Sequence, residues 1–467
     1  MRYVMKFGGS SVKEAGFRAI CNIVSGYKGN DLVVVVSALK GVTDGLLNAA
    51  KKAELGEREL VDNFLIELRK EHSSIISNSI SNVPIWLEGN LSRADRELEQ
   101  ALQAIMHLRE ASPRSIDYVL SFGERYSSEI ACAALTSCGL KSKSFTGGEA
   151  GIITNDRFGG ATPIVELTRK KVKSTLCPLL EEGVIPVVGG FAGRTEDGIT
   201  TTLGRGGSDY TATILADAID ADEVIIWSDV DGIMTADPKI EPEAVTVPEI
   251  TYEEAADMAV LGAKSLHPRA LEPLVEKRIP LRLKNTFNPE REGTLITDKL
   301  SRPFPSVVKV ISMINDVGML TIKGSSMVGE PGTAARLFSR LADARINIMM
   351  ISQSISETNI SVVIKRESLK KAQDALEKDF AQEGEKVEAE SDVSVIAAVG
   401  EGMKGTPGVA ARMFKAVADV GINVRMIAQG SSELNISFVT KEADAMKAVR
   451  ALHKEFIKKR LCKQGTQ

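Results

Sequence analysis

The chain has 467 residues, of which 43% are hydrophobic and 26% are charged, and this predicts a folded protein of about three domains. Its 58 Lys and Arg residues against 62 Asp and Glu residues leave a net charge of −4, and aromatic residues make up 5%. We therefore expect no nucleic-acid or membrane partner, because both need a basic surface and single strands also need aromatic platforms.

The cysteines and histidines argue against two further classes of protein. The five cysteines are scattered without a C-x-x-C pair, and the four histidines are far apart. A disulfide framework or a structural metal site is therefore not expected, and a reducing, cytoplasmic location fits better. The chain has no apolar run near the roughly 18 residues of a membrane span, and its N-terminus lacks the apolar core of a signal peptide.

The first 300 residues alternate predicted strands and helices. Residues 3–7 and the Val-rich run 32–36 read as strands, and residues 46–108 are charged and helical in period, with a break near Pro84. Later strands are predicted at 184–188 and 224–227. This order predicts an α/β domain with a mainly parallel sheet, whose ligands bind beyond the carboxyl ends of the strands.

The first motif is Lys6-Phe7-Gly8-Gly9-Ser10-Ser11, a strand that ends in two glycines before a helix. Bare backbone and a helix N-terminus suit an anion, and Lys6 adds a cation. Phosphate binding and a plain tight turn both remain open. The motif is not a Walker A loop, because the chain contains no Gly-Lys pair.

The second motif, Thr201–Asp209, contains three glycines around an arginine and leads into a helix. Arg205 is suited to grip a carboxylate through two nitrogens. Ser208 and Asp209 could serve the chemistry or simply cap the helix.

Three shorter motifs follow strands or begin helices, and each has an ordinary structural alternative. Ser228–Gly232 could face a nucleotide or form an Asp-Gly turn. Glu124 could bind an amine or pair with a basic neighbour. Lys264 could be a second phosphate cation or a solvated side chain, and His267 before a proline suits a structural role. Together the motifs predict a site for a phosphorylated nucleotide and a small carboxylated substrate, where phosphoryl transfer needs alignment and charge neutralisation.

Pro- and Gly-rich segments near residues 288–305 indicate a domain boundary, and an internal repeat follows. The pattern Gly-x-Pro-Gly-x-Ala-Ala-Arg-x-Phe at 329–338 recurs 76 residues later at 405–414. Each copy reads as strand, turn, helix, strand, strand, helix, so we expect two small α+β domains. A lone G-x-G-x-x-G at 400–405 lies inside the second copy and is interpreted as a repeat turn.

The motif set resembles the aspartokinase family, and the paired repeats resemble its tandem ACT domains. The motifs that carry the resemblance are Lys6–Val12, Ser121–Glu124, Leu203–Asp209, Gly262–Pro268 and Asn285–Phe287. The resemblance implies an amino-acid-kinase fold over residues 1–300, followed by ferredoxin-like ACT domains over 306–385 and 393–462. It also implies the reaction of ATP and L-aspartate to 4-phospho-L-aspartate with Mg²⁺, at the start of lysine, threonine, methionine and isoleucine synthesis.

The resemblance also implies roles for single residues. Lys6 would stabilise the transferring phosphoryl group, and Asp209 would orient Lys6 and Lys264. Backbone donors to the phosphates would come from Gly8, Gly9 and Ser10, and the nucleotide would also contact Ser228, Asp229 and Lys264. Substrate contacts would come from Ser37, Thr43, Glu124, Arg205 and Ser208, with Arg205 on a carboxylate and Glu124 on the ammonium. Relatives often have Thr at position 228 and Arg at 284, where this chain has Ser228 and Lys284.

The ACT pair implies feedback control by an end-product amino acid. The implied pocket residues are Met327, Gly332, Thr333, Ala334, Asn347, Ile348, Met349, Gln353 and Ser354. Lysine-sensing relatives have an acid where Met349 stands, and 346–351 contains none, so we expect threonine before lysine. We further expect a homodimer or homotetramer through the ACT domains, and no fused homoserine dehydrogenase. The alternatives are another amino-acid kinase, for glutamate, acetylglutamate or uridylate, and a non-catalytic amino-acid sensor.

Overall fold

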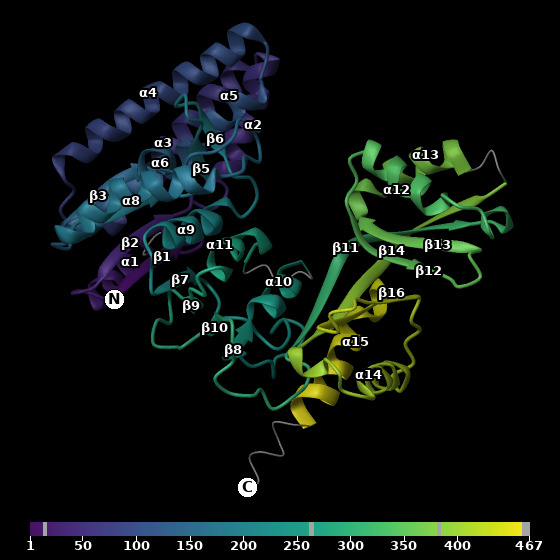
Figure 1. Cartoon of the computed structure of the whole chain (residues 1–467). Helices are drawn as coiled ribbons and strands as arrows, with labels where there is room; N and C mark the ends of the chain where they lie inside the picture. The colour runs from purple at the N-terminus through teal and green to yellow at the C-terminus, as the bar shows by residue number, and fades with distance from the viewer. Residues whose placement is uncertain (13–15, 261–265, 381–383, 460–467) are drawn as a thin grey trace. The chain divides into compact units, whose positions relative to one another are not determined.

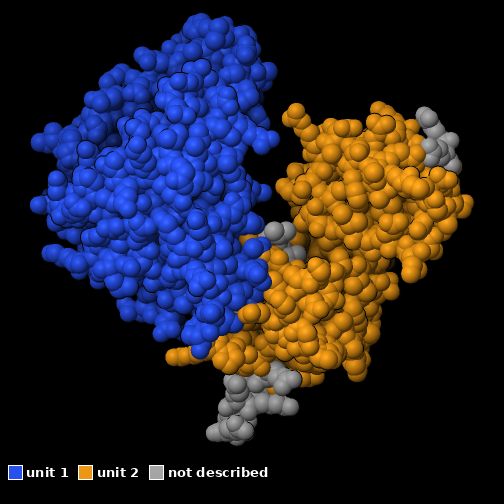
Figure 2. Space-filling view, in the orientation of Figure 1, with its two compact units in different colours: residues 1–233, 248–256, 264–301 blue, residues 234–247, 257–263, 302–467 orange. Residues whose placement is uncertain are grey.

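The computed structural model describes residues 1–12, 16–260, 266–380 and 384–459 (Figure 1). The chain divides into two compact units, which are coloured separately in Figure 2. The first contains Met1–Ile233, Pro248–Ala256 and the described part of Lys264–Ser301. The second contains Met234–Val247 and the described parts of Asp257–Ala263 and Arg302–Gln467.

The first unit is built on an eight-stranded sheet in the order β3-β4-β2-β1-β7-β9-β10-β8. Its strands are β1 (Arg2–Phe7), β2 (Asp31–Val36), β3 (Ser142–Thr146), β4 (Ile185–Gly189), β7 (Glu223–Ser228), β8 (Glu249–Thr251), β9 (Leu281–Asn285) and β10 (Thr294–Thr297), with a separate hairpin of β5 (Ala192–Arg194) and β6 (Thr200–Thr202). All neighbouring pairs in the large sheet are parallel except β9 with β10. The α/β class with a mainly parallel sheet is therefore confirmed.

The helices of the first unit follow the apolar periodicity of the sequence. They are α1 (Gly16–Gly26), α2 (Val42–Leu55), α3 (Arg58–Ser79), α4 (Ile85–Leu108), α5 (Pro113–Leu120), α6 (Phe122–Ser137), α7 (Gly147–Ala150), α8 (Val165–Glu181), α9 (Gly207–Ala218), η1 (Pro268–Ala270) and α11 (Glu272–Val275). A further helix, α10 (Tyr252–Val260), runs from residues of the first unit into residues of the second. The predicted helical stretch 46–108 is three helices, with its second break at Pro84 as expected.

The centre of the sheet is buried because its strands are continuous apolar runs. Residues Leu32–Val36 are all buried, as is most of β1, which lies between β2 and β7. In strands covered on both faces the side chains of both faces are buried. Burial of each large aliphatic side chain stabilises the fold by roughly 1.5–3 kcal/mol. Because β4, β2, β1 and β7 are neighbouring parallel strands, their carboxyl ends form one edge of the sheet, which carries the loops of the site.

The second unit contains a six-stranded antiparallel sheet in the order β12-β13-β11-β14-β16-β15. Its elements are β11 (Val310–Lys323), η2 (Ser325–Met327), α12 (Thr333–Asp343), β12 (Ile348–Gln353), β13 (Asn359–Lys365), η3 (Arg366–Ser368), α13 (Leu369–Phe380), β14 (Lys386–Val399), η5 (Glu401–Met403), α14 (Val409–Ala418), β15 (Met426–Gln429), β16 (Asn435–Lys441), α15 (Glu442–His453) and η6 (Lys454–Lys458). Each copy of the repeat gives the predicted α+β pattern, so the repeat is confirmed as two similar folds.

The repeat is visible in single contacts as well as in element order. Arg336 lies over the ring of Phe380 at 4.2 Å, and 76 residues later Arg412 lies over Phe456 at 4.6 Å. Both arginines also pair with a glutamate of their own copy. The same guanidinium therefore packs each copy's first helix against its C-terminal segment.

The two copies exchange a strand segment. The first part of β11, 310–314, pairs with 395–399 of β14, whereas 317–323 pairs with 386–393 and with β13. Ile311 accordingly packs in the apolar core of the second copy. The expected boundaries of 306–385 and 393–462 therefore differ from the strand pairing, because the long strands β11 and β14 each serve both copies.

Residues 234–247, which we expect in the first domain, belong to the second unit. Thr235 Oγ1 is 3.0 Å from Nε2 of the buried His453, and Arg450 Nε donates to the Ile240 carbonyl at 2.9 Å. The Thr235 carbonyl also accepts from Ile311 N–H at 2.8 Å. Local sequence pattern cannot reveal this placement, because these partners are distant in the chain.

Candidate active site

Backbone hydrogen bonds bring several predicted motifs to one edge of the large sheet. The Gly8 N–H donates to the Trp227 carbonyl at 3.1 Å, and Gly190 N–H donates to Val36 O at 3.0 Å. Ser37 N–H donates to the carbonyl of Phe7 at 3.1 Å. The turns after β1, β2, β4 and β7 are thus tied together by extensions of the parallel ladder.

Lys6 and Asp209 form an ion pair at the centre of this edge. Lys6 Nζ lies 2.5 Å from Asp209 Oδ1, and the side chains are 11% and 14% exposed. Lys6 points from the end of β1, and Asp209 lies in the first turn of α9. An acid at this position also complements the helix dipole. The sequence-predicted pair is therefore brought together, although its residues are about 200 positions apart in the chain.

Glu124 lies beside this pair as a buried acid. It is 5% exposed, and its Oε2 has no hydrogen-bond partner. Burial raises the pKa of Glu124 to about 8, while the Ala38 backbone, the Lys6 charge and the Ser208 hydroxyl act in the opposite direction. A buried carboxyl group with a free oxygen is suited to receive a cationic group.

Glycines make the close approach of these segments possible. A Cβ atom at Gly190 would lie 2.7 Å from Ser208 Cβ, and one at Gly189 would lie 2.9 Å from the Glu124 carbonyl oxygen. A Cβ atom at Gly9 would lie 2.8 Å from Ala38 O. These three positions therefore need glycine because side chains would separate the segments that form the site.

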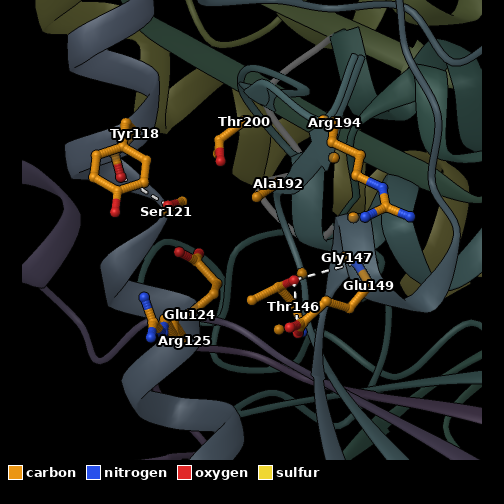
Figure 3. A pocket seen from close by; sticks show the side chains of 15 residues that line it. Tyr118, Ser121, Glu124, Arg125, Thr146, Gly147, Glu149, Ala192, Arg194 and Thr200 are labelled. Carbon is orange, nitrogen blue, oxygen red and sulfur yellow. Dashed lines mark hydrogen bonds between the residues drawn. The ribbon is translucent and has the colours of Figure 1, made fainter. Parts of the chain in front are cut away.

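A cavity of about 180 Å³ opens next to Glu124. Its wall contains residues from α5, α6, α7 and the β5–β6 hairpin, among them Tyr118, Ser121, Gly147, Ala192 and Thr200. Figure 3 shows the Glu124 carboxylate pointing into the space between Ser121 and Ala192. The cavity places open volume beside a buried acid, as a small amino-acid substrate requires.

Arg205 lies in the turn that leads into α9. Its side chain is exposed, and the flanking Gly204 and Gly206 have φ of 78° and 73°. His267 packs against this turn, since a Cβ at Gly206 would lie 2.3 Å from His267 Cβ. The nearby Arg269 lies over the Tyr210 ring at 4.9 Å. This arrangement fits the structural role expected for His267, and the turn presents Arg205 outward.

The remaining predicted nucleotide residues lie at the carboxyl ends of β1 and β7. Gly9 and Ser10 are half-buried after β1, Ser228 is the last residue of β7, and the exposed Asp229 follows it. The Gly8 N–H, one of the expected phosphate donors, donates to the Trp227 carbonyl in this structure as an extension of the β1–β7 pairing. Lys264 lies outside the described residues.

The predicted substrate residues Ser37 and Thr43 flank the turn between β2 and α2. Ser37 immediately follows β2, and Thr43 lies in the first turn of α2. Both are half-buried.

The sequence motifs did not predict two residues that lie near the site. Phe191 has φ of 67°, a strained value for a large side chain, and its carbonyl accepts from Leu203 N–H at 2.8 Å. Asp117 is completely buried and bonds to the strand before the Arg205 turn. Neither residue belongs to a recognisable motif, so the sequence carried no signal for them.

A second cavity of about 300 Å³ lies in the first repeat copy. Five predicted effector residues line it: Met327, Gly332, Thr333, Ala334 and Gln353. The predicted residues Asn347, Ile348, Met349 and Ser354 are not among its lining, and Met349 instead packs beside the apolar cluster that contains Met350. Two carboxylates that the sequence did not predict for this pocket, Glu330 and Glu357, also line it.

Within residues 1–12, 16–260, 266–380 and 384–459, no group of three His, Cys, Asp or Glu side chains could hold a metal ion. No helix in the described part of the chain is long and apolar enough to cross a bilayer.

Comparison with known proteins agrees with this architecture. The amino acid kinase family model matches residues 1–285, and an ACT domain model matches 320–380 and 396–456. Aspartokinase 1, chloroplastic, of Arabidopsis thaliana is 34% identical over 97% of this chain and 80% of its own length. Aspartokinase of Geobacillus stearothermophilus is 35% identical over 97% and 96%.

Solved structures lead to the same family. Aspartokinase III of E. coli in complex with aspartate and ADP has a TM-score of 0.81 and 30% identity, over 97% of this chain and 99% of that chain. The same enzyme in complex with lysine and aspartate has a TM-score of 0.82 and 30% identity, over 98% and 99%. The fold and its parallel-edge site define an amino acid kinase that carries a pair of ACT domains. Within that class, the chain belongs to the aspartokinase family.

Proposed function

We propose that the chain transfers the γ-phosphoryl group of ATP to the side-chain carboxylate of L-aspartate, giving 4-phospho-L-aspartate and ADP. The observation that carries the proposal is the Lys6–Asp209 pair beside the buried Glu124 at the carboxyl ends of the sheet. The substrate carboxylate is itself the nucleophile, so the protein has to align two anions and neutralise their charge.

The proposed roles follow from charge and position. Lys6 stabilises the negative charge that develops on the transferring phosphoryl group, and Asp209 holds its ammonium in place. Glu124 receives the substrate ammonium, and Arg205 binds the α-carboxylate in a bidentate manner. Ser37, Thr43 and Ser208 add hydroxyl groups on the substrate side.

The nucleotide is proposed to lie along the turns after β1 and β7. Gly9 and Ser10 donate backbone N–H groups to phosphate, and Ser228, Asp229 and Lys264 complete the site. Mg²⁺ usually binds through one or two carboxylates and the substrate's phosphates. Asp229 is exposed in the turn after β7, so its carboxylate suits this kind of Mg²⁺ binding. When bound, the ion would help to neutralise the charge of the phosphates.

We further propose that the cavity in the first repeat copy binds a regulatory amino acid, with threonine favoured over lysine. Glu357 is already engaged, because its Oε2 accepts from Gly329 N–H at 2.8 Å, and the equivalent Glu433 accepts from Gly405 N–H at 2.7 Å. Glu330 is exposed, so the side-chain ammonium of a bound lysine would remain solvated beside it and would gain little from the ion pair. The E. coli relative was crystallised with lysine, so both amino acids have to be compared.

The direct test is a coupled ADP-release assay with L-aspartate, L-glutamate, N-acetyl-L-glutamate and UMP as acceptors. Turnover with aspartate alone supports the proposal. Turnover with another acceptor favours a different amino-acid kinase, and no turnover with any acceptor, together with amino-acid binding, favours a non-catalytic sensor. With this function we propose that the chain acts at the start of lysine, threonine, methionine and isoleucine synthesis. We also propose a cytoplasmic location, and a homodimer or homotetramer that forms through the ACT domains.

A further inference from the structure

Asp117, on α5, is a buried carboxylate whose donors are backbone and hydroxyl groups. Its side chain is 0% exposed. Gly159 N–H lies 3.0 Å from both carboxylate oxygens, and Thr202 donates its N–H and its hydroxyl at 2.8 Å each. Burial raises the pKa of Asp117, and these hydrogen bonds lower it. A fully buried acid is costly, so its bonding has to serve the structure around it.

The two partners of Asp117 belong to segments that meet at the Arg205 turn. Thr202 ends β6, three residues before Arg205. Gly159 lies in a loop that packs on the same turn, because a Cβ at Gly204 would lie 3.3 Å from Gly159 O. The Ala161 N–H also donates to the Thr202 carbonyl at 2.8 Å. Asp117 therefore binds the loop and the strand on which the Arg205 turn rests.

The other end of the same helix leads directly to Glu124. Ser121 N–H donates to the Asp117 carbonyl at 3.1 Å, and Ser121 alone separates α5 from α6. Tyr118, Ser121 and Glu124 line the cavity opposite residues that include Thr200 of β6. Figure 3 shows Tyr118, Ser121 and Glu124 along one side of the cavity, with Thr200 and Ala192 across from them. Asp117 thus joins the wall that carries Glu124 to the strand that leads to Arg205.

We infer that Asp117 is a positioning residue that fixes the distance between Glu124 and the Arg205 turn, and thereby the fit of the amino-acid substrate. This inference rests on the proposed roles of Glu124 and Arg205. Asp117 does not touch the reacting atoms, so its removal misplaces the substrate's ammonium and α-carboxylate contacts without removing either. Aspartate and glutamate share those two groups and differ by one methylene before the reacting carboxylate, so the position of the shared groups decides which of the two side-chain lengths reaches the phosphoryl group.

The test is steady-state kinetics of Asp117→Ala, Asp117→Asn and a matched control. Asp117→Ala is expected to raise KM for aspartate about tenfold or more, with kcat changed about threefold at most, because misplacement weakens binding before chemistry. Asp117→Asn is expected to recover most of the affinity, since one amide oxygen still accepts the N–H groups and the Thr202 hydroxyl can rotate to accept from the amide nitrogen. The ratio of kcat/KM for aspartate over glutamate should fall in the alanine variant.

The control is Asp217→Ala, at the far end of α9. Asp217 is also buried, at 4% exposed, and it pairs with Arg169 and Lys277. The Asp217→Ala variant should have a lower melting temperature than the wild type and a KM for aspartate near the wild-type value. Equal effects of Asp117→Ala and Asp217→Ala on KM would overturn the inference, because both would then act only through stability.

Two further variants keep the inference falsifiable. If Asp117→Ala does not fold, Thr202→Val removes one of the four hydrogen bonds and should raise KM by a smaller factor; an unchanged KM contradicts the positioning role. Arg205→Ala separates the two levels of the argument. An unchanged KM in Arg205→Ala would count against the proposed site itself, whereas a raised KM there with a normal KM in Asp117→Ala would overturn only the inference.

Discussion

Lys6 Nζ and Asp209 Oδ1 lie 2.5 Å apart in a setting where neither side chain is more than 14% exposed. The pair joins the end of β1 to the first turn of α9, and Glu124 lies close enough for the Lys6 charge to lower its pKa. Lys6 therefore acts on two acids at once, forming the ion pair with Asp209 and favouring the ionised form of Glu124.

Removing Lys6 should abolish most of the turnover. We expect Lys6→Ala to lower kcat by about 10²–10³-fold, the cost typical of losing one preorganised group that stabilises transition-state charge. The measurement is ADP release at saturating ATP and aspartate, with folding checked by circular dichroism. Lys28→Ala, at an exposed position of the same unit, is the control and should be near wild type. Near-normal turnover of Lys6→Ala would remove Lys6 from the mechanism.

Glu124 should make aspartate binding depend on pH. Its pKa is raised to about 8 by burial, so the carboxyl group is largely neutral at pH 7 before substrate binds. Binding an ammonium needs the ionised form, and KM for aspartate should therefore fall as pH rises from about 6.5 to 8.5. Glu124→Gln should raise KM and remove this dependence. A wild-type KM that does not vary over this range would contradict the assignment of the ammonium to Glu124.

The same group predicts the direction of a stability change. Because the pKa of Glu124 is raised in the folded protein, its contribution to stability is present below the unfolded pKa near 4.5 and is lost as pH rises through about 8. The melting temperature of Glu124→Gln should therefore fall less than that of the wild type between pH 6 and 8.5. If the melting temperatures of the two proteins fell equally between pH 6 and 8.5, Glu124 would not be protonated in the ligand-free fold.

The tight approach at Gly190 should be sensitive to one methyl group. Gly190→Ala places Cβ 2.7 Å from Ser208 Cβ, and overpacking of this kind costs about 1–3 kcal/mol. We expect a lower melting temperature and a lower kcat/KM, because Ser208 and Asp209 move together at the start of α9. Gly26→Ala, where a Cβ meets no atom within 4 Å, is the matched control. Equal activity of the two variants would mean that the approach of β4 to α9 is not needed for catalysis.

The repeat offers an internal control for the effector site. Gln353 lines the cavity of the first copy, and Gln429 holds the equivalent position of the second copy, 76 residues later. Threonine at about 100 times its dissociation constant should stabilise the wild type by about 2.7 kcal/mol in a thermal-shift titration. Gln353→Ala should weaken this effect, and Gln429→Ala should retain it. Stabilisation by lysine alone would reverse the proposed order of effectors.

Local patterns predicted the parts of the fold that depend on neighbouring residues. The Val-rich run 32–36 is a buried strand, and the residues around Gly329 and Gly405 are equivalent turns, as expected from the sequence. The pairing of Lys6 with Asp209 could be expected only through the family resemblance. It depends on the order of strands in the sheet, which spacing along the chain does not contain.

Other features could not be read from the sequence for the same physical reason. Asp117 has an ordinary helical neighbourhood, and its importance comes from donors 42 and 85 residues away. Residues 234–247 lie between segments of the first unit along the chain but pack with the second unit, as the contact of Thr235 with His453 shows. Long-range contacts of this kind decide burial and partners, whereas composition and periodicity report only local preference.

The exchange of strand segments between β11 and β14 limits how the regulatory half can be dissected. A fragment that begins at 393 lacks 310–314, which fills the sheet next to its own first strand, and a fragment that ends at 385 lacks 386–390 in the same way. Each fragment would present an unpaired strand edge and would be prone to self-association. Expression of the regulatory half therefore needs both copies in one piece, with β11 complete from 310 and β14 complete to 399.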